Sequence, residues 1–581
     1  MKNLKLKVIS KYLKPYKKEF LMGALALLLV NILSVVIPLQ VKNIIDQLQN
    51  NFSKDFVISK SLFLILLATC MGLIRLFSRQ IVFGIGRKVE VNLRQKLFDH
   101  LLVQDPEWIQ KKGSGDIISR ATSDVENIRR LLGFTVLSLC NIVLAYSFTI
   151  PSMFSINKTL TISTLMIFPL ILGIVSLFGG RMVNQRKAQQ ESLSKLSDLI
   201  QEDLSGISAI KIYGQENAEK NEFNIYNDAY RNSAIKLART ASTLFPLLQG
   251  ISSISLLILL GLGTYQLESG FISIGGLVAL ILFVERLVFP TALLGFTLNT
   301  FQLGQVSLDR VEEIFKNKPN IKDGANSKFL KKKVEGLLEA KNLIIKYPGS
   351  KFNSLNNLNF KIFPGELIAI VGPVGCGKTT LAKSLGRTIE IPGGQLFLDE
   401  IDIKNIKLED LRKNIAIVPQ EAFLFTSTIS ENLRFGKPKA SRGLIKESAV
   451  KAGLIDDINN FPQKFKTIVG ERGITLSGGQ RQRTALGRAL LVNSPIVILD
   501  DALASVDNKT AARIIDEMRK RTNKTILMIS HQLSVAATCD RVLVMDKGKI
   551  VQEGHHLDLL KEDGLYKKLW ERELATNIVN S

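Results

Sequence analysis

The chain has 581 residues, 46% of them hydrophobic, with 76 Lys and Arg against 52 Asp and Glu and a formal net charge of +24. This length allows two or more domains. Nucleic acid is not the expected partner despite the charge, because the basic residues are spread beside long apolar runs and no basic-aromatic recognition module is visible. The four cysteines show no metal-type spacing, so we expect reduced thiols.

Six apolar stretches in the first half are each long enough to cross a bilayer, which takes about 20 residues. The first is too long for a signal-peptide core, and no small-residue cleavage site follows it, so we expect it to be retained. Together they predict an all-α transmembrane domain over residues 20–315. The six stretches lie near 20–41, 59–83, 131–153, 159–179, 243–267 and 271–295.

The positive charges predict the orientation of this domain. The N-terminal segment and the long connections 84–130 and 180–240 are rich in Lys and Arg, whereas the other connections are short and carry few positive charges. By the positive-inside rule, the N-terminus, the long connections and the C-terminal half face the cytosol, with the chain in the inner (plasma) membrane. Residues 1–19 are typical of a basic amphipathic helix on the inner membrane surface. The helical periodicity of both long connections predicts helices that continue well below the bilayer.

Four charged residues fall inside the predicted spans, where charge is costly and often functional. Arg75 and Arg79 share one helix face, which favours a cavity or the inner membrane surface over lipid. Glu285, beside Arg286, is consistent with a preference for cationic compounds, but pairing with a neighbouring helix is the more frequent explanation. No residue identifies a substrate.

A polar linker over residues 316–335 leads into a soluble domain, residues 336–581. Strand and helix patterns alternate in this part of the chain, which predicts an α/β domain with a largely parallel sheet.

The run GPVGCGKTT directly follows the strand-like run LIAIV and has the spacing of a P-loop. Its glycines let backbone N–H groups turn toward phosphate oxygens, and the following helix N-terminus adds a favourable dipole. Lys378 is expected to reach the β and γ phosphates, and the Thr379 hydroxyl is expected to bind Mg²⁺. The predicted nucleotide-binding residues here are Gly372, Pro373, Val374, Gly375, Cys376, Gly377, Lys378, Thr379 and Thr380.

The run PIVILDDALASVD, residues 495–507, contains a buried strand that ends at Asp500, a carboxylate able to hold Mg²⁺ through water. Asp501 is placed to polarise the attacking water, a role that most ATP-hydrolysing machines with this pattern give to glutamate. The shorter side chain retracts the carboxylate, and a misplacement of about 1 Å can cost on the order of 10²-fold in rate. The site should therefore bind ATP and turn it over slowly, unless the backbone shifts to compensate or another group polarises the water.

The run LSGGQ, residues 476–480, completes a resemblance to an ATP-binding-cassette (ABC) exporter half-transporter, with six spans fused to one cassette, over essentially the whole chain. Further residues match the family. Tyr347 in IIKYPG lies where an aromatic ring stacks on adenine, and Gln420 in IAIVPQ matches the glutamine that links Mg²⁺ and water to the membrane domain. His531 in MISHQLS matches the switch histidine at the γ-phosphate. The run TIVGERG, 467–473, resembles the segment that touches the transmembrane loops, and Asp507 the loop that faces the other cassette.

The resemblance implies a dimer in which two cassettes hold two ATP molecules at their interface. Ser477, Gly478, Gly479 and Gln480 would cap the phosphate on the P-loop of the partner chain. Residues 104–128 and 205–219 resemble the two coupling loops of exporters, although solvated cytosolic helices would also explain their charge.

In heterodimeric exporters one subunit carries Asp at the position of Asp501 and keeps an intact LSGGQ. This chain has both features and resembles the first subunit of Mdl-type bacterial multidrug exporter pairs, which favours a heterodimer over a homodimer. The intact His531 weakens this inference slightly.

The expected function is ATP-driven export of amphipathic compounds, drugs or lipids, from the cytosol or inner leaflet. A regulatory or channel-like relative that binds ATP with little pumping is the alternative that Asp501 alone favours. Six spans exclude a soluble cassette ATPase, and an importer is disfavoured because its permease and cassette are usually separate chains.

Overall fold

The computed structural model describes residues 9–50, 53–330, 332–504, 506, 508–519 and 524–580. The first eight residues of the predicted surface helix and Asp507 lie outside these ranges. The chain divides into two compact units. We call Met1–Leu102 with Gly113–Asn317 the helical unit, and Val103–Lys112 with Lys318–Ser581 the α/β unit.

The helical unit contains six helices, within the described residues, that are long and apolar enough to cross a membrane, which confirms the six predicted spans. Several extend far beyond the apolar stretch, since α3 has 49 residues, α11 has 53 and α12 has 43. The principal helices are α2 (Lys17–Asn50), α3 (Lys54–Leu102), α7 (Val136–Ile156), α8 (Lys158–Leu165), α9 (Phe168–Ser205), α11 (Glu216–Glu268) and α12 (Ile274–Lys316), with α5 (Ser114–Ser119), α6 (Val125–Arg130) and α10 (Ile207–Tyr213) shorter.

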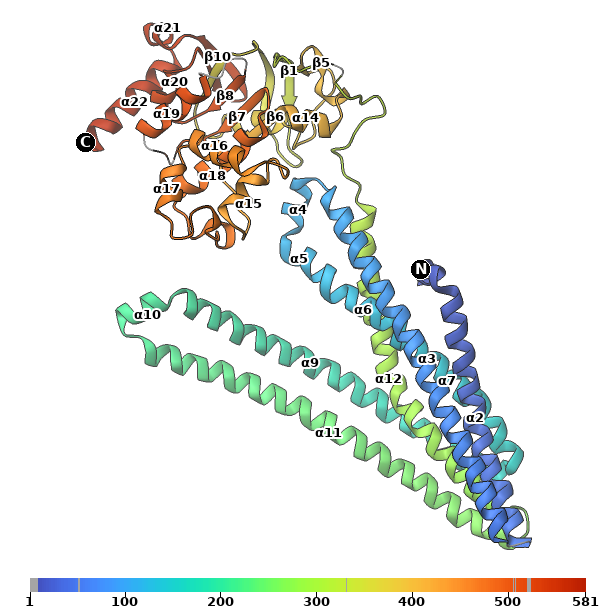
Figure 1. Cartoon of the computed structure of the whole chain (residues 1–581). Coiled ribbons are helices and arrows are strands. Elements are labelled where there is room, and N and C mark those ends of the chain that lie inside the picture. Colours follow the sequence, from blue (N-terminus) through green and yellow to red (C-terminus); the bar gives the residue numbers. More distant parts are fainter. Residues whose placement is uncertain are drawn as a thin grey trace. The chain divides into compact units, whose positions relative to one another are not determined.

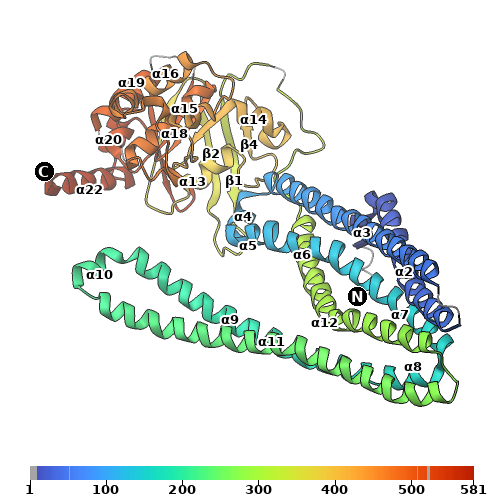
Figure 2. The same ribbon diagram turned by 60° about the horizontal axis from the view of Figure 1, so that its bottom comes forward.

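Helix α12 lies at the centre of this unit, in contact with α2, α7, α9 and α11 (Figure 1). Its N-terminus is fixed by Asp46, whose carboxylate accepts the Ser273 hydroxyl at 2.8 Å and the Gly275 N–H at 2.9 Å. Gly275 is required by this close approach, because a Cβ there would lie 2.2 Å from the Lys42 carbonyl oxygen. Figures 1 and 2 both show α9 and α11 side by side, with α10 joining their ends.

Two π-helical segments, Arg120–Asp124 and Leu131–Thr135, interrupt the helix that leads into α7. The predicted span 131–153 therefore begins in π geometry, a feature that no sequence pattern indicated. The second segment packs against α3 where Gly133 faces Gly86, and a Cβ on Gly86 would lie 3.1 Å from the Arg129 carbonyl oxygen. Isolated π turns are rare and are frequent at functional sites.

The α/β unit contains two sheets rather than one. The larger has the strand order β10-β9-β3-β8-β7-β6 and is parallel from β9 to β6, as predicted. The smaller, β2-β1-β4-β5, is wholly antiparallel and was not predicted. The strands are β1 (Leu338–Ile345), β2 (Leu355–Ile362), β3 (Leu367–Val371), β4 (Leu396–Leu398), β5 (Ile401–Asp402), β6 (Ile415–Val418), β7 (Ile496–Asp500), β8 (Thr525–Ile529), β9 (Arg541–Asp546) and β10 (Lys549–Gly554).

Hydrophobic clusters cover both faces of the parallel sheet, so its central strands are buried throughout. Along β3, Ile368 and Ile370 face one cluster, while Leu367, Ala369 and Val371 face the other. Burial on both faces explains the continuous apolar runs in the sequence. The helices of this unit are α4 (Pro106–Lys112), α13 (Lys378–Leu385), α14 (Leu408–Asn414), α15 (Ile429–Arg434), α16 (Arg442–Lys451), α17 (Ile455–Asn460), α18 (Gly478–Val492), α19 (Asn508–Arg519), α20 (Leu533–Ala536), α21 (His556–Lys561) and α22 (Leu565–Asn580).

Candidate nucleotide site and coupling segments

The P-loop joins the carboxyl end of β3 to the N-terminus of α13. The backbone requires glycine at position 377. Gly377 has φ +108°, and a Cβ there would lie 2.5 Å from the Ser354 carbonyl oxygen. The Lys378 ammonium lies inside the loop and donates to the carbonyls of Gly372 at 2.8 Å and Pro373 at 3.0 Å. The loop thus combines a glycine backbone, one ammonium and a helix N-terminus, the elements that bind phosphate.

Other residues of the predicted set surround this loop. Val374 is exposed, whereas Cys376 is buried with its Sγ 3.7 Å from the Lys378 Nζ. Tyr347 follows β1 and is half-buried, with its hydroxyl 3.4 Å from the Thr380 Oγ1. The aromatic ring is therefore anchored beside the first turn of α13.

Asp500 ends β7 and is buried. The Thr379 hydroxyl donates to its Oδ1 at 3.3 Å, which brings the P-loop and the β7 carboxylate together. Burial raises the pKa of Asp500, and the neighbouring Asp501 adds to the rise, while the Thr379 hydrogen bond and the charges of Lys383 and Lys378 oppose it. A hydroxyl beside a carboxylate is the oxygen donor set that Mg²⁺ uses in nucleotide sites, so the residues present fit that ion.

Asp501 is half-buried in the left-handed region, at φ +52°. Asp tolerates this conformation better than most residues because its short polar side chain bonds locally. Its N–H donates to the Ile529 carbonyl at 2.8 Å, and its Oδ1 accepts the His531 N–H at 3.4 Å. The end of β8 therefore fixes both its backbone and its carboxylate.

His531 and Gln420 have exposed side chains and follow the ends of β8 and β6. Because β6, β7 and β8 are parallel neighbours, their carboxyl ends meet at one edge, beside Asp500 and Asp501. Gln482 was missed by the sequence argument, although it lies two residues after LSGGQ. Its Nε2 is 3.5 Å from the carbonyl oxygens of both Gln420 and Asp501, so it links α18 to this edge.

The LSGGQ residues form the N-terminus of α18. A capping box holds it, because the Ser477 hydroxyl accepts the Gln480 N–H at 3.3 Å and the Gln480 Oε1 accepts the Ser477 N–H at 3.0 Å. Gln480 also donates to Asp457 at 3.0 Å. Among the residues that the structure describes, no hydrogen bond or ion pair joins residues 477–480 to residues 372–380 of the same chain.

Comparisons with known proteins decide the family. Residues 20–291 match the ABC transporter transmembrane region, and residues 355–504 match the ABC transporter domain. The chain is 33% identical over 570 residues to the multidrug resistance-like ATP-binding protein MdlA of Buchnera aphidicola subsp. Baizongia pistaciae, covering 97% of this chain and 96% of that protein. The chain belongs to the ABC transporter family.

A lipid exporter and a solved exporter structure are also similar to this ABC transporter. It is 28% identical over 575 residues to the ATP-dependent lipid A-core flippase 1 of Colwellia psychrerythraea, with 97% and 95% of the two chains covered. It matches the structure of a bacterial Atm1-family ABC exporter with ATP bound at 25% identity and a TM-score of 0.78, covering 96% and 98% of the chains. The protein is thus a multi-pass membrane exporter of the multidrug and lipid-flippase type, with an ATPase domain that binds ATP.

The first of the two segments predicted to couple the transporter's domains begins inside the α/β unit. Asp105, buried just before α4, accepts the N–H groups of Asn320 and Ile321 at 2.9 and 3.0 Å. This carboxylate ties a loop between transmembrane helices to the first residues after α12.

The remainder of this segment is tied to α12 within the helical unit. Arg310 of α12 pairs with Asp116 at 2.7 Å and Asp124 at 2.9 Å, and Arg120 pairs with Glu313 at 2.8 Å. Arg120 and Asp124 are buried in the first π-helical segment. These ion pairs connect α5 and the first π-helical segment directly to α12 in this transporter.

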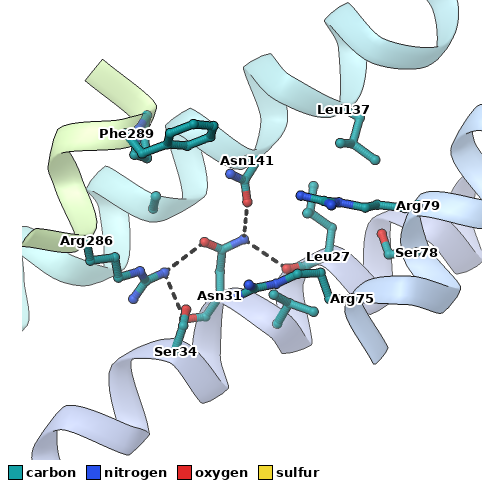
Figure 3. A pocket seen from close by; sticks show the side chains of 13 residues that line it. Leu27, Asn31, Ser34, Arg75, Ser78, Arg79, Leu137, Asn141, Arg286 and Phe289 are labelled. Carbon is teal, nitrogen blue, oxygen red and sulfur yellow. Dashed lines mark hydrogen bonds between the residues drawn. The ribbon is translucent and has the colours of Figure 1, made fainter. Parts of the chain in front are cut away.

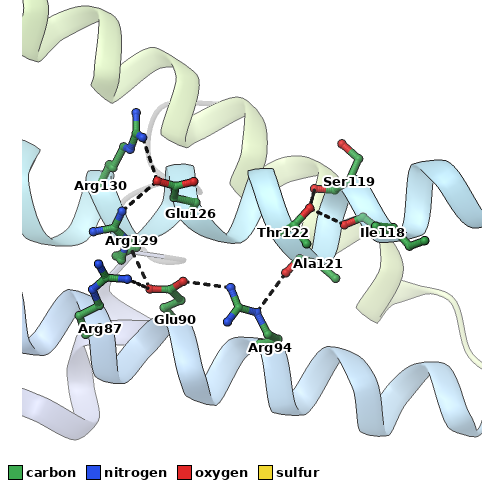
Figure 4. Close-up of polar contacts among 10 residues, drawn as sticks. All are labelled: Arg87, Glu90, Arg94, Ile118, Ser119, Ala121, Thr122, Glu126, Arg129 and Arg130. Atoms are coloured by element: carbon green, nitrogen blue, oxygen red, sulfur yellow. Dashed lines mark hydrogen bonds and ion pairs between the residues drawn. The ribbon is translucent and has the colours of Figure 1, made fainter. Parts of the chain in front are cut away.

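A second polar cluster connects α3 to α6 (Figure 4). Glu90 is buried and pairs with Arg87 and Arg94 at 3.0 Å and with Arg129 at 3.3 Å. Glu126 pairs with Arg129 at 3.0 Å and with Arg130 at 2.8 Å, at a more exposed position. Glu90 is therefore the one carboxylate of this cluster that bridges the two helices.

The other predicted coupling segment forms α10 at the turn between α9 and α11. Ile212 and Tyr213 are 77% and 75% exposed there. The run TIVGERG, residues 467–473, also has an exposed apolar side chain, that of Ile468. The next residue, Val469, is buried, and its N–H donates to the Ser427 carbonyl at 2.8 Å.

Proposed function

We propose that this exporter subunit works as one half of a heterodimer, in which the ATP site on its own P-loop turns over slowly. The observation that carries the proposal is the position of Asp501. Its backbone is held by the Ile529 carbonyl and its carboxylate by the His531 N–H, so the short side chain has little freedom to move forward. A base that stops about 1 Å short of its water costs on the order of 10²-fold in rate.

The remaining site residues have the following roles in this proposal. Tyr347 stacks on adenine, the P-loop and Lys378 bind the phosphates, and His531 contacts the γ-phosphate. Thr379, Asp500 and Gln420 hold Mg²⁺, either directly or through water. That ion, when bound, offsets the negative charge of the phosphates. The hydrogen bond from Thr379 to Asp500 supports this assignment, because it brings two of the three donors together.

The partner chain supplies the second half of each ATP site. Ser477, Gly478, Gly479 and Gln480 of one chain cap the phosphate on the P-loop of the other, with the N-terminus of α18 facing the anion. This arrangement is supported by the exposure of Ser477 and the lack, among the described residues, of any bond from this motif to the P-loop of its own chain. ATP binding then closes the pair and hydrolysis reopens it.

The transported compounds are amphipathic drugs or lipids, moved from the cytosol or the inner leaflet of the inner (plasma) membrane, with the N-terminus and the α/β unit in the cytoplasm. The Lys and Arg content of the N-terminal segment and the long connections supports this orientation. The relatives named multidrug and lipid exporters support the substrate range.

ATP-dependent accumulation of an amphipathic dye in inverted membrane vesicles tests the proposal. We expect accumulation with wild-type protein and its loss when Lys378→Ala and the matching substitution in the partner are combined. A Lys549→Ala variant is the matched control, since Lys549 lies exposed on β10. If ATP lets the dye equilibrate across the membrane but not accumulate against its gradient, the protein is an ATP-regulated channel-like relative and the export proposal is wrong.

A further inference from the structure

A cavity of about 280 Å³ lies among four helices of the helical unit: α2, α3, α7 and α12. Three of its lining residues are arginines, Arg75 and Arg79 from α3 and Arg286 from α12, and none is acidic (Figure 3). Guanidinium groups stay protonated at any physiological pH. The cavity therefore carries three positive charges inside the part of the chain that crosses the membrane.

These arginines have no ion-pair partner in the described part of the chain. Among the described residues, the one hydrogen bond of the Arg75 side chain goes to the Met71 sulfur, at 3.7 Å, and Glu285 is exposed without an ion pair although it neighbours Arg286. The predicted pairing of Glu285 with a neighbouring helix is therefore absent from the residues described. An unpaired cation at membrane depth costs free energy, so such residues usually face a polar cavity and serve function.

Asn31 holds Arg286 in place at the centre of the cavity (Figure 3). Its Oδ1 accepts the Arg286 Nη2 at 3.0 Å, while its Nδ2 donates to the Leu27 carbonyl at 2.9 Å and the Asn141 Oδ1 at 3.2 Å. Asn31 is 2% exposed, and these bonds fix its amide. The other terminal nitrogen of Arg286, Nη1, is buried with no hydrogen-bond partner among the described residues.

The cavity thus has a fixed donor that lacks an acceptor, two further cations and an apolar rim. Leu27, Val30, Leu137 and Phe289 supply the apolar side chains. Arginine is suited to bind carboxylate and phosphate oxygens with two parallel hydrogen bonds. Apolar groups beside these donors suit the hydrocarbon portion of the same molecule.

We propose that this cavity binds the anionic headgroup of the transported amphiphile, a phosphate or carboxylate ester of a hydrophobic tail. The assignment rests on the proposed export function and narrows its substrate class. Arg286 and Arg75 bind the oxyanion, and Asn31 is a positioning residue for Arg286. Cationic amphiphiles are disfavoured at this site by charge repulsion.

Two probes with the same twelve-carbon tail test the assignment, dodecyl phosphate and dodecyltrimethylammonium. Binding of each is measured to the purified, assembled transporter in phosphatidylcholine nanodiscs, with binding to empty nanodiscs subtracted. We expect dodecyl phosphate to bind at least about tenfold more tightly, and Arg286→Gln or Arg75→Gln to weaken it about tenfold each. Arg181→Gln, an exposed arginine of α9 outside the cavity, is the matched control and should leave binding unchanged.

Competition separates the possible sources of the anion. Displacement of dodecyl phosphate by inorganic phosphate would show that the headgroup alone is recognised. Displacement only by nanodiscs containing phosphatidic acid would show that a lipid is required. Either result supports an anion site, whereas equal affinity for both probes, or unchanged binding in the arginine variants, overturns it.

Two further outcomes separate this assignment from the proposed function. If the arginine variants fail to assemble and wild-type protein does not bind dodecyl phosphate, the arginines pair with the partner chain and the assignment is wrong. The thermal midpoint and the assembled mass of every variant verify its folding. Arginine-dependent binding without ATP-driven transport of any amphiphile would overturn the proposed function and leave the anion site standing.

Discussion

The backbone N–H of His531 donates to the Asp501 carboxylate at 3.4 Å, so the residue after β8 orients the acid after β7. The same strand end also accepts the Asp501 N–H, at 2.8 Å. These two contacts from one neighbouring strand hold the residue in place. The length of its side chain therefore sets how far the carboxylate reaches. Under the proposed function, the turnover rate of this ATP site depends on a single methylene group.

Replacing Asp501 with Glu tests this relation. The longer side chain extends the carboxylate toward the water, at a small conformational cost because φ is +52° there. In the assembled transporter we expect the steady-state ATPase rate to stay within about twofold of wild type or to rise. Asp501→Asn should cost little, because the partner's site carries most turnover.

The ATPase rate of the purified pair under saturating ATP is the measurement for both variants. A matched substitution of the corresponding acid in the partner serves as the control and should abolish most activity. A large loss from Asp501→Glu would show that the aspartate is an adequate base in its own setting.

The buried carboxylate of Asp500 should make the free energy of unfolding depend on pH. Burial raises its pKa in the folded protein, so the folded chain keeps this proton at a pH where the unfolded chain has lost it. The ionised carboxylate therefore lowers the free energy of unfolding above its folded pKa, and this penalty disappears as the pH falls through that pKa. Asp500→Asn should raise the thermal midpoint by up to a few degrees at pH 8, and by progressively less as the pH is lowered through the pKa of Asp500 in the folded protein.

Thermal unfolding without nucleotide or magnesium measures this difference, with the exposed Asp558→Asn as the control. The same Asp500→Asn protein should lose magnesium-dependent ATP hydrolysis at its own site. A variant that is less stable than wild type at pH 8 would mean that the Thr379 hydrogen bond outweighs the cost of burial.

The substitution Asp105→Ala should reduce transport more than ATP hydrolysis. The Asp105 carboxylate accepts two backbone N–H groups, from Asn320 and Ile321, and an Ala there leaves both without that acceptor, at a cost of about 1–3 kcal/mol. Transport should fall about tenfold while basal ATPase activity stays within about twofold. Asp99→Ala, an exposed aspartate of α3, is the control. Equal losses of transport and ATPase activity would indicate a folding defect instead.

Glu90 should stabilise the helical unit more than Glu126 does. Glu90 is 9% exposed at its side chain and pairs with three arginines, whereas the Glu126 side chain is 44% exposed. Glu90→Gln should cost about 1–3 kcal/mol, less than a fully buried pair because its arginines can rehydrate. Glu126→Gln should cost under about 1 kcal/mol.

Thermal unfolding of the two variants in detergent compares them directly. Glu90→Gln should lower the midpoint by several degrees and Glu126→Gln by no more than about two. Equal shifts would show that burial of the Glu90 carboxylate contributes nothing beyond a surface pair.

The sequence predicted features of this protein that depend on local patterns. The six spans and the strand before the P-loop each need only a continuous apolar run, which is visible without knowing its neighbours. Neither local pair of the antiparallel sheet, β1 with β2 and β4 with β5, was recognised in the sequence, and the pairing of β1 with β4 that joins them spans more than fifty residues. No periodicity in the sequence could predict the contact of Asn31 with Arg286, because it joins two helices that are far apart in the chain.

The heterodimer is tested by the native mass and composition of the tagged transporter, purified from the membranes of its own cells. We expect a second, homologous chain in equal amount, with Glu at the position that corresponds to Asp501. A single species at twice the mass of this chain would contradict the heterodimer. Both ATP sites would then carry the short acid, and Asp501 would have to serve as the working base.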